Sequence, residues 1–199
     1  MVRAFIDEAV CPACAAIGME YTAEEVDLPF LGNSLETMLR CEPCGYRHTD
    51  FILTGSHEPT RHTLRVATAE HMSTRVVRSS SGTIRIPELG ILIEPGVASE
   101  AFISNVEGIL VRVERVLGQI LRDADSDEER LRIVELQQTM ERMREGQAEP
   151  VTLILEDPFG NSSILGAGAT AETMTPEEAE KLKVGMMTFD PKGNLIKEG

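Results

Sequence analysis

The sequence contains no tryptophan, and aromatic residues make up only 4% of its 199 residues. We therefore expect a core built mainly from Ile, Leu, Val and Met. No apolar run approaches the roughly 20 residues that a helix needs to cross a bilayer. Asp7 and Glu8 interrupt the apolar stretch that a secretory signal would need near the start. These absences favour a cytoplasmic protein that has no membrane partner.

Basic residues are also scarce. The chain contains 19 Lys and Arg residues and 33 Asp and Glu residues, which gives a formal net charge of −14. A protein of this charge repels the phosphate backbone of DNA and RNA, so direct nucleic-acid binding is disfavoured. The same charge steers the molecule toward a partner protein with a basic face.

Motifs for nucleotide chemistry are missing. The sequence contains no G-x-x-x-x-G-K-[ST] phosphate loop and no G-x-G-x-x-G segment after a strand. The stretch ILGAGATAE, residues 164–172, contains Gly166 and Gly168 but lacks the rest of such a motif. The spacing of Ser, His and Asp residues supports no catalytic triad. We therefore expect no enzymatic activity.

Cysteine is absent from the last 155 residues, yet four cysteines occur in the first 44. They form two Cys-x-x-Cys pairs, Cys11 with Cys14 and Cys41 with Cys44, and 26 residues separate the pairs. In a reducing cytosol such pairs indicate metal binding and not disulfides. Two tight turns can aim four thiolates at one point, which is the tetrahedral set that Zn²⁺ prefers.

A zinc ion held by four thiolates has no open coordination position, so we expect this ion to be structural. One alternative is a redox Cys-x-x-Cys pair, which would need a βαβ context, and another is thiols that share no ligand. Two pairs at this spacing disfavour both alternatives. His48, four residues past Cys44, is expected on the surface or beside the site.

Strand-like stretches lie between and after the two pairs, at residues 19–28, 33–40 and 47–54. The turn formers of PFLGNS separate the first two stretches. We expect a three-stranded zinc ribbon over residues 1–55. Metal binding supplies folding free energy on the order of 10 kcal/mol, which stabilises a module too small for an adequate core of its own.

Residues 56–199 are expected to form a second, β-rich domain. Strand patterns occur over residues 61–69, 73–79, 83–96, 151–156 and 187–190. A short helix is expected from Thr175, which is placed as its N-cap, to Gly185. Pro176 takes the first helical position of this helix and Glu178 completes a capping box.

A helical hairpin is predicted within this domain, at about residues 98–146. From Ser99, apolar residues recur with the i, i+3 and i+4 steps of a helix. Ser126 with Glu129 forms a capping box for the second helix, which stops at Gly146.

The apolar stripe of the first helix is wider than one short partner helix would cover, so part of it must meet the β-domain or a client protein. Met140 and Met143 of the second helix either form an adaptable binding face or, as is more common, belong to the core.

Three histidines could suggest a cupin-like metal site: His57, His62 and His71. Metal ligands must converge, and the sequence contains neither an H-x-H pair nor a matching later set of Glu and His, so isolated surface histidines are favoured. Three arginines could form a small basic strip: Arg75, Arg78 and Arg85. Strand alternation places the first two on different faces, which argues against the strip.

Four stretches carry a resemblance to a known family: CPAC…CEPCGYR in residues 11–47, RVVRSSSGTIRIPELGILIEPG in 75–96, ISNVEGIL in 103–110 and EDPFGNSSI in 156–164. Their order resembles that of the ZPR-type zinc-finger family, in which a zinc ribbon precedes a β-rich A-domain. The IRIPEL and DP-x-GNS strings are the specific parts of the match. With a single copy of the module, the chain is similar to the archaeal form.

The resemblance implies a fold that is mainly β with some α structure. A four-cysteine zinc ribbon precedes a β-rich domain that is similar to a double-stranded β-helix, with the helical hairpin inserted. Eukaryotic members bind translation elongation factor 1-alpha and assist its folding. The resemblance therefore implies that this chain binds the archaeal counterpart, plausibly as a folding or assembly chaperone. The alternative is a zinc-ribbon accessory factor of transcription or RNA machinery.

The DPFGNS loop is the candidate partner-binding segment, with Asp157, Phe159, Gly160 and Asn161 as its candidate residues. A structural turn between two strands is the alternative, and turn propensities favour it because Asp and Asn side chains bond to nearby backbone. The Phe159 ring is either tucked under the loop or presented to a partner.

Overall fold

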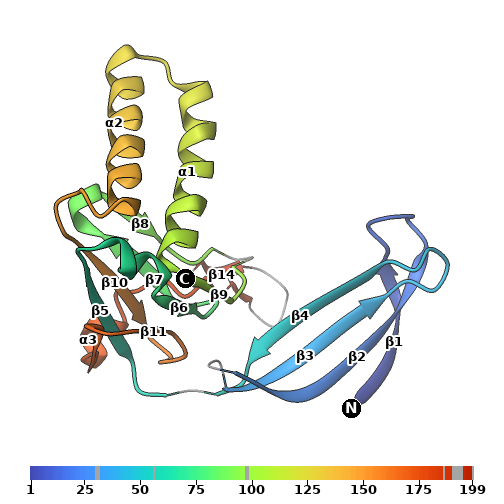
Figure 1. Cartoon of the computed structure of the whole chain (residues 1–199). Helices are drawn as coiled ribbons and strands as arrows, with labels where there is room; N and C mark the ends of the chain where they lie inside the picture. Colours follow the sequence, from blue (N-terminus) through green and yellow to red (C-terminus); the bar gives the residue numbers. More distant parts are fainter. Residues whose placement is uncertain (30–31, 56, 97–98, 186, 190–194, 199) are drawn as a thin grey trace. The chain divides into compact units, whose positions relative to one another are not determined.

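A computed structural model describes residues 1–29, 32–55, 57–96, 99–185, 187–189 and 195–198 of the chain. The chain divides into two compact units, Met1–Ser56 and His57–Gly199, each of which is described by itself (Figure 1).

The N-terminal unit is an antiparallel sheet whose strands follow chain order. These strands are β1 (Val2–Val10), β2 (Ile17–Leu28), β3 (Gly32–Arg40) and β4 (Arg47–Leu53). The three expected strands correspond to β2, β3 and β4, and β1 is an additional strand. β1 is exposed along nearly its whole length, and its register with β2 shifts between Ile6 and Val10. Its sequence therefore lacks the alternation of burial that marks a strand.

The C-terminal unit contains two sheets, one with strand order β12-β5-β10-β7-β8 and one with order β11-β6-β9. The strands are β5 (Thr60–Val66), β6 (Arg75–Arg78), β7 (Thr83–Ile86), β8 (Ile91–Ile93), β9 (Phe102–Asn105), β10 (Val151–Asp157), β11 (Ser163–Leu165) and β12 (Thr170–Thr173). This unit also contains two 3₁₀ turns, η1 (Ala69–Ser73) and η2 (Pro87–Leu89), and a separate pair of strands, β13 (Met187–Phe189) and β14 (Leu195–Glu198).

The core of the C-terminal unit is shared by both sheets and by the helical hairpin. Its members include Leu64, Val76, Ile84, Leu110 and Leu153, all of them fully buried. β10 is central because it pairs with both β5 and β7. Met140 and Met143 are also buried, so the hairpin methionines belong to the core, which was the more common of the two expected roles.

The predicted hairpin consists of α1 (Val106–Asp123) and α2 (Asp127–Arg144), which project from the sheets of this unit as an antiparallel pair (Figure 1). The expected start of the first helix at Ser99 is wrong, because Phe102–Asn105 pair with β6 as strand β9. The helix begins after Asn105, whose side chain accepts a hydrogen bond from Gly108 N–H at 2.8 Å. Pairing with a distant strand thus overrides the helical spacing of Phe102.

The two predicted N-caps are present, but the capping box predicted at Ser126 is formed only in part. Ser126 Oγ accepts the N–H of Glu129 at the start of α2, without the return bond from the Glu129 side chain. Thr175 and Glu178 form the expected capping box of α3 (Pro176–Ala179). This helix ends at Ala179, earlier than the expected end at Gly185.

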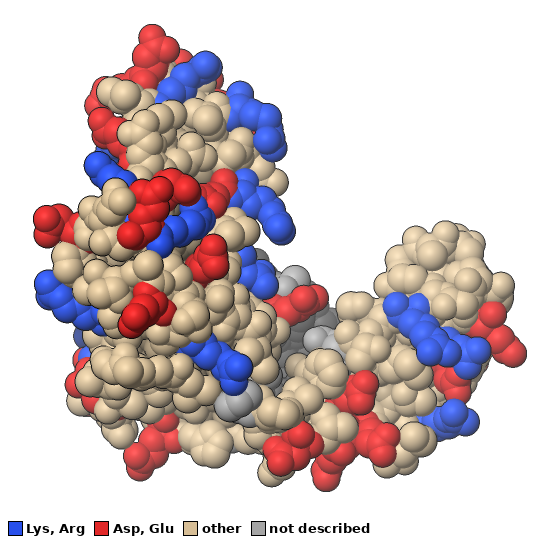
Figure 2. Space-filling model, viewed as in Figure 1, with Lys and Arg blue, Asp and Glu red and all other residues tan. Residues whose placement is uncertain are grey.

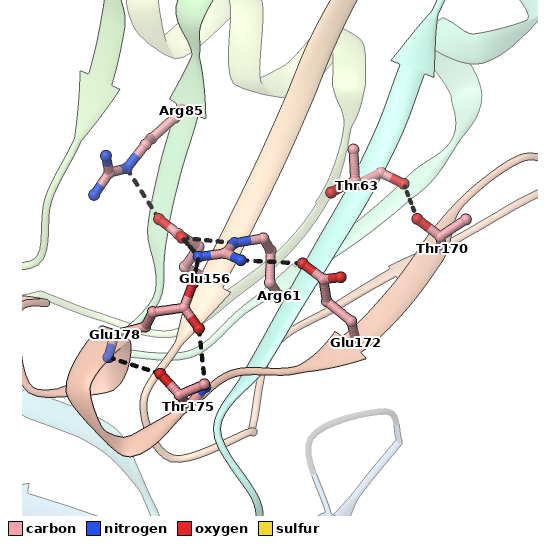
Figure 3. A network of polar contacts seen from close by, with 8 residues as sticks. All are labelled: Arg61, Thr63, Arg85, Glu156, Thr170, Glu172, Thr175 and Glu178. Carbon is pink, nitrogen blue, oxygen red and sulfur yellow. Dashed lines mark hydrogen bonds and ion pairs between the residues drawn. The ribbon is translucent and has the colours of Figure 1, made fainter.

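Glu156, near the end of β10, is the centre of a network of ion pairs (Figure 3). One oxygen of its carboxylate lies 2.8 Å from Arg61 of β5, and the other lies 3.0 Å from Arg85 of β7. Arg61 also pairs at 3.0 Å with Glu172 of β12 and with Glu178 of α3. The network therefore links four strands of one sheet to the short helix that follows them.

We predict that Asn105→Ala destabilises the C-terminal unit by about 1 kcal/mol, because the N-cap hydrogen bond of α1 is lost. Thermal unfolding followed by circular dichroism measures this change as a fall in the melting temperature. Asn105→Asp is the matched control, since it keeps the capping oxygen and should melt close to the parent protein. Equal losses in the two variants would show that the cap does not contribute to stability.

Candidate functional site

The two Cys-x-x-Cys pairs lie in two turns of the same shape. In the first turn, Cys11 N–H donates to the carbonyl of Ala16 and Ala15 N–H donates to the carbonyl of Cys11, both at 2.9 Å. The equivalent bonds of the second turn, around Cys41, have the same length. The first turn joins β1 to β2 and the second joins β3 to β4, and because β2 pairs with β3, both turns lie at the same end of the sheet.

The four thiols meet at one point. All four Sγ atoms lie within 4.8 Å of one another. The Sγ atoms of Cys11 and Cys44 are 3.7 Å apart, and so are those of Cys14 and Cys41. A tetrahedron with Zn–S bonds of about 2.3 Å has S–S edges of about 3.8 Å, and the two 3.7 Å distances match this spacing. The four cysteines hold one structural Zn²⁺.

The pKa values of the clustered thiols indicate that a bound cation would stabilise the four thiolates. The Cys44 backbone N–H favours the Cys41 thiolate, but burial and the three neighbouring thiols outweigh it and raise the pKa of Cys41 to about 12. At Cys11 burial opposes the thiolate, yet the backbone N–H groups of Cys14 and Ala13 and the thiols of Cys41 and Cys44 lower its pKa to about 7. A dication among the sulfurs stabilises all four thiolates together.

The two turns place different residue types at the same left-handed backbone position. Gly45 has a φ of +73°, and its equivalent in the first turn, Ala15, has a φ of +58°. A side chain in this left-handed region costs about 1 kcal/mol because Cβ approaches the following carbonyl oxygen. Ala15 is therefore strained in a conformation that the turn requires.

The DPFGNS loop is organised around Asp157, which is fully buried. Its carboxylate accepts five hydrogen bonds of 2.6 to 3.1 Å, from the hydroxyls of Ser79, Ser81 and Ser162 and from the backbone N–H groups of Phe159 and Asn161. Glu156 and Asp157 are successive strand residues, so they point to opposite faces and serve two separate networks. The buried position means that Asp157 shapes the loop and does not itself face a partner.

Residues 158–161 of the loop are half-buried, whereas Ser162 is buried, and the loop lies against the start of the unit. The carbonyl of Phe159 accepts the N–H of His57 at 2.9 Å. Gly160 has a φ of +65°, and a Cβ there would collide with the carbonyl oxygen of Glu58. This position requires glycine for both its backbone conformation and its close packing.

The three predicted surface histidines form no metal site within the described part of the chain, where the cysteine cluster is the single group of three or more potential ligands. His71 Nδ1 lies 2.9 Å from the Thr68 hydroxyl. His62 lies on β5, where burial lowers its pKa even though the charge of Asp157 and a backbone hydrogen bond of Ser162 act in the opposite direction.

The three arginines that could have formed a strip lie in different environments. Arg78 is buried, and its Nε donates to the carbonyl of Gly82 at 2.7 Å. Arg85 pairs with Glu156, and Arg75 is exposed. The burial of Arg78 could not be read from the sequence, since it depends on segments that meet only in the folded chain.

Residues 70–184 match the family model of the ZPR1 jelly-roll domain. The chain belongs to the ZPR1 family. The expected fold is thereby confirmed: it is mainly β, with a four-cysteine ribbon before a jelly-roll domain. No helix in the described part of the chain is long and apolar enough to cross a membrane.

Similar ZPR1 proteins occur in archaea and eukaryotes. A ZPR1-like protein of Methanocaldococcus jannaschii is 41% identical over 181 residues, which cover 90% of this chain and 91% of that protein. Human zinc finger protein ZPR1 is 32% identical over 79% of this chain but only 34% of its own length. The zinc finger chaperone zpr1 of Schizosaccharomyces pombe is 29% identical over 87% of this chain and 39% of its own length. The single-module form is therefore shared with the archaeal relative.

We predict that Ala15→Gly stabilises the N-terminal unit by about 0.5–1 kcal/mol, because glycine relieves the left-handed strain. The expected observation is slower loss of zinc to a colorimetric chelator at neutral pH. Gly45→Ala is the converse variant and should lose zinc faster. A faster loss from Ala15→Gly would contradict the strain argument.

We predict that Asp157→Asn lowers the free energy of unfolding of the C-terminal unit by about 2–3 kcal/mol, because one acceptor oxygen becomes a donor facing other donors. Urea denaturation monitored by circular dichroism gives the change. Asp125→Asn makes the same substitution at an exposed position between α1 and α2 and should leave stability unaltered. Similar midpoints for Asp157→Asn and the parent would refute the role assigned to the buried carboxylate.

Proposed function

We propose that this protein is a non-enzymatic, cytoplasmic interaction factor that binds translation elongation factor 1-alpha and assists its folding or assembly. The observation that carries the proposal is the combination of a closed four-thiolate zinc centre with membership of a family that includes a fission yeast zinc finger chaperone. The elongation factor as partner is what the resemblance to eukaryotic members implies.

The chemistry of the zinc centre supports a binding role. Four protein thiolates fill the tetrahedral shell, so no position is left for a water molecule or a substrate. The zinc therefore stabilises a rigid surface. The eukaryotic relatives are named as zinc finger proteins or as a chaperone, and these names agree with an interaction factor.

The DPFGNS loop is the segment that we propose contacts the partner. Phe159, Gly160 and Asn161 retain partial exposure, and five hydrogen bonds to the buried Asp157 carboxylate hold the loop in one shape. A loop that is ordered before binding loses little conformational entropy on binding, which favours affinity. Phe159 supplies the apolar contact and the other two residues supply backbone shape.

The proposal predicts that the purified protein binds archaeal elongation factor 1-alpha in at least one of three states: nucleotide-free, GDP-bound or GTP-bound. Isothermal titration calorimetry with each state measures the affinity. Phe159→Ala should weaken binding about fivefold or more, whereas Leu165→Ala, at an exposed apolar position on β11, should not.

Absence of binding to all three states would refute this partner. A gel shift with RNA and DNA tests the accessory role in transcription or RNA machinery. Tight, salt-sensitive binding in that assay would favour the accessory role over the proposed one.

A further inference from the structure

A groove lies along α1 in the C-terminal unit, between this helix and residues 90–94 and 99–102. Its volume is about 740 Å³, which falls in the range of sites that enclose a small ligand or a short peptide segment. The apolar side chains of its wall include Ile91, Leu92, Ile93, Val113, Val116 and Ile120.

Much of this apolar wall is uncovered. Leu92 and Val116 are each 53% exposed, and Ile120 is 41% exposed. Val113, Val116 and Ile120 follow the helical i, i+3 and i+7 spacing, so they form one stripe on α1. The wide apolar stripe of this helix therefore contributes only partly to the core, and the rest of it lines the groove.

One end of the groove is cationic. Two guanidinium groups lie over the ring of Phe102, with Arg112 4.2 Å and Arg78 5.6 Å from its centroid. Arg78 is held in place by the Gly82 carbonyl at 2.7 Å and the Ser99 hydroxyl at 3.0 Å. Arg112 is exposed on the first turns of α1. Figure 2 shows several Arg side chains (blue) along the α1 side of the hairpin, which contains no Lys.

Among the residues that the structure describes, no carboxylate forms an ion pair with Arg78 or Arg112. Of the two acidic residues in the wall, Glu94 is paired with Lys183 at 2.8 Å, and Glu100 offers its carbonyl to Arg78. The wall therefore contains two arginines and two glutamates, and Glu94 is already paired with Lys183 outside the wall, so the exposed Arg112 is the cation that an incoming carboxylate can reach.

Burial lowers the pKa of Arg78, the charge of Asp157 raises it, and the charge of Arg112 lowers it by a smaller amount. A carboxylate that entered the groove would stabilise the charged guanidinium groups of Arg78 and Arg112. Hydrogen bonds between ionised groups are stronger than those between neutral groups.

We propose that this groove binds a short peptide segment of a partner protein that presents apolar side chains to the α1 stripe and an acidic side chain to Arg112. The nine residues from Arg112 to Ile120 rise about 12 Å along the helix axis over eight steps, which matches about four residues of an extended peptide or two turns of a helix. This proposal goes beyond the proposed function, because the peptide segment could belong to a partner other than the elongation factor. The peptide test and the elongation-factor test can therefore fail separately.

The test uses a fluorescein-labelled peptide, Gly-Ser-Leu-Leu-Glu-Leu-Leu-Ser-Gly, and sister peptides with Gln or Lys in place of Glu. Fluorescence anisotropy at low salt with the full chain should show the Glu peptide binding about tenfold tighter than the Lys peptide. Arg112→Glu should reverse this order, and Val116→Asp should weaken binding of the uncharged Gln peptide. Arg115→Glu is the matched control, since it makes the same charge change on α1 outside the groove wall, and it should leave the order unchanged.

Three results would overturn the inference. The first is equal binding of the three peptides, and the second is an Arg112→Glu variant that keeps the preference for Glu. The third is sedimentation of the chain with phosphatidylglycerol vesicles that Arg112→Glu and Val116→Asp abolish while no peptide binds, which would assign the groove to a lipid surface. Melting temperatures of the variants within a few degrees of the parent ensure that loss of binding does not reflect unfolding.

Discussion

The tetrathiolate zinc centre is the interaction on which the N-terminal unit depends. The buried cluster of this unit, among the residues described, consists of Cys11, Met19 and Cys41, so two of its three members are themselves metal ligands. A sheet that is exposed along β1 and has so small a core cannot bury enough apolar area to offset the conformational entropy of folding. Metal binding supplies the stabilising free energy that the small core does not provide, because the free energy of binding the metal contributes to the free energy of folding.

The C-terminal unit, in contrast, is stabilised by an apolar core. Its central strand, β10, ends in two polar residues. β10 carries two adjacent carboxylates that point to opposite sides of the sheet. Glu156 joins strands and α3 through arginines, while Asp157 fixes the loop that follows it. The same unit leaves an apolar and cationic groove open along α1. Its rigid core therefore presents both a shaped loop and a groove, which is what an interaction factor requires.

Features that depend on neighbouring residues could be predicted from the sequence. The zinc ligands, the N-caps at Ser126 and Thr175 and most strands follow from spacing and from local side-chain chemistry. The features that the sequence did not reveal depend on contacts between distant segments. β1 lacks a pattern of burial, β9 forms only because β6 is there to pair with it, and the burial of Asp157 and Arg78 depends on where separate loops meet.

The central claim is that zinc holds the N-terminal unit folded and that this unit and the jelly-roll domain are stabilised independently. Hydrogen–deuterium exchange read by mass spectrometry, before and after removal of zinc with a chelator, tests it most directly. We expect amides of residues 1–55 to lose protection while those of β5, β10 and α1 keep theirs. Unchanged protection across the four-stranded sheet after complete zinc removal would contradict the account.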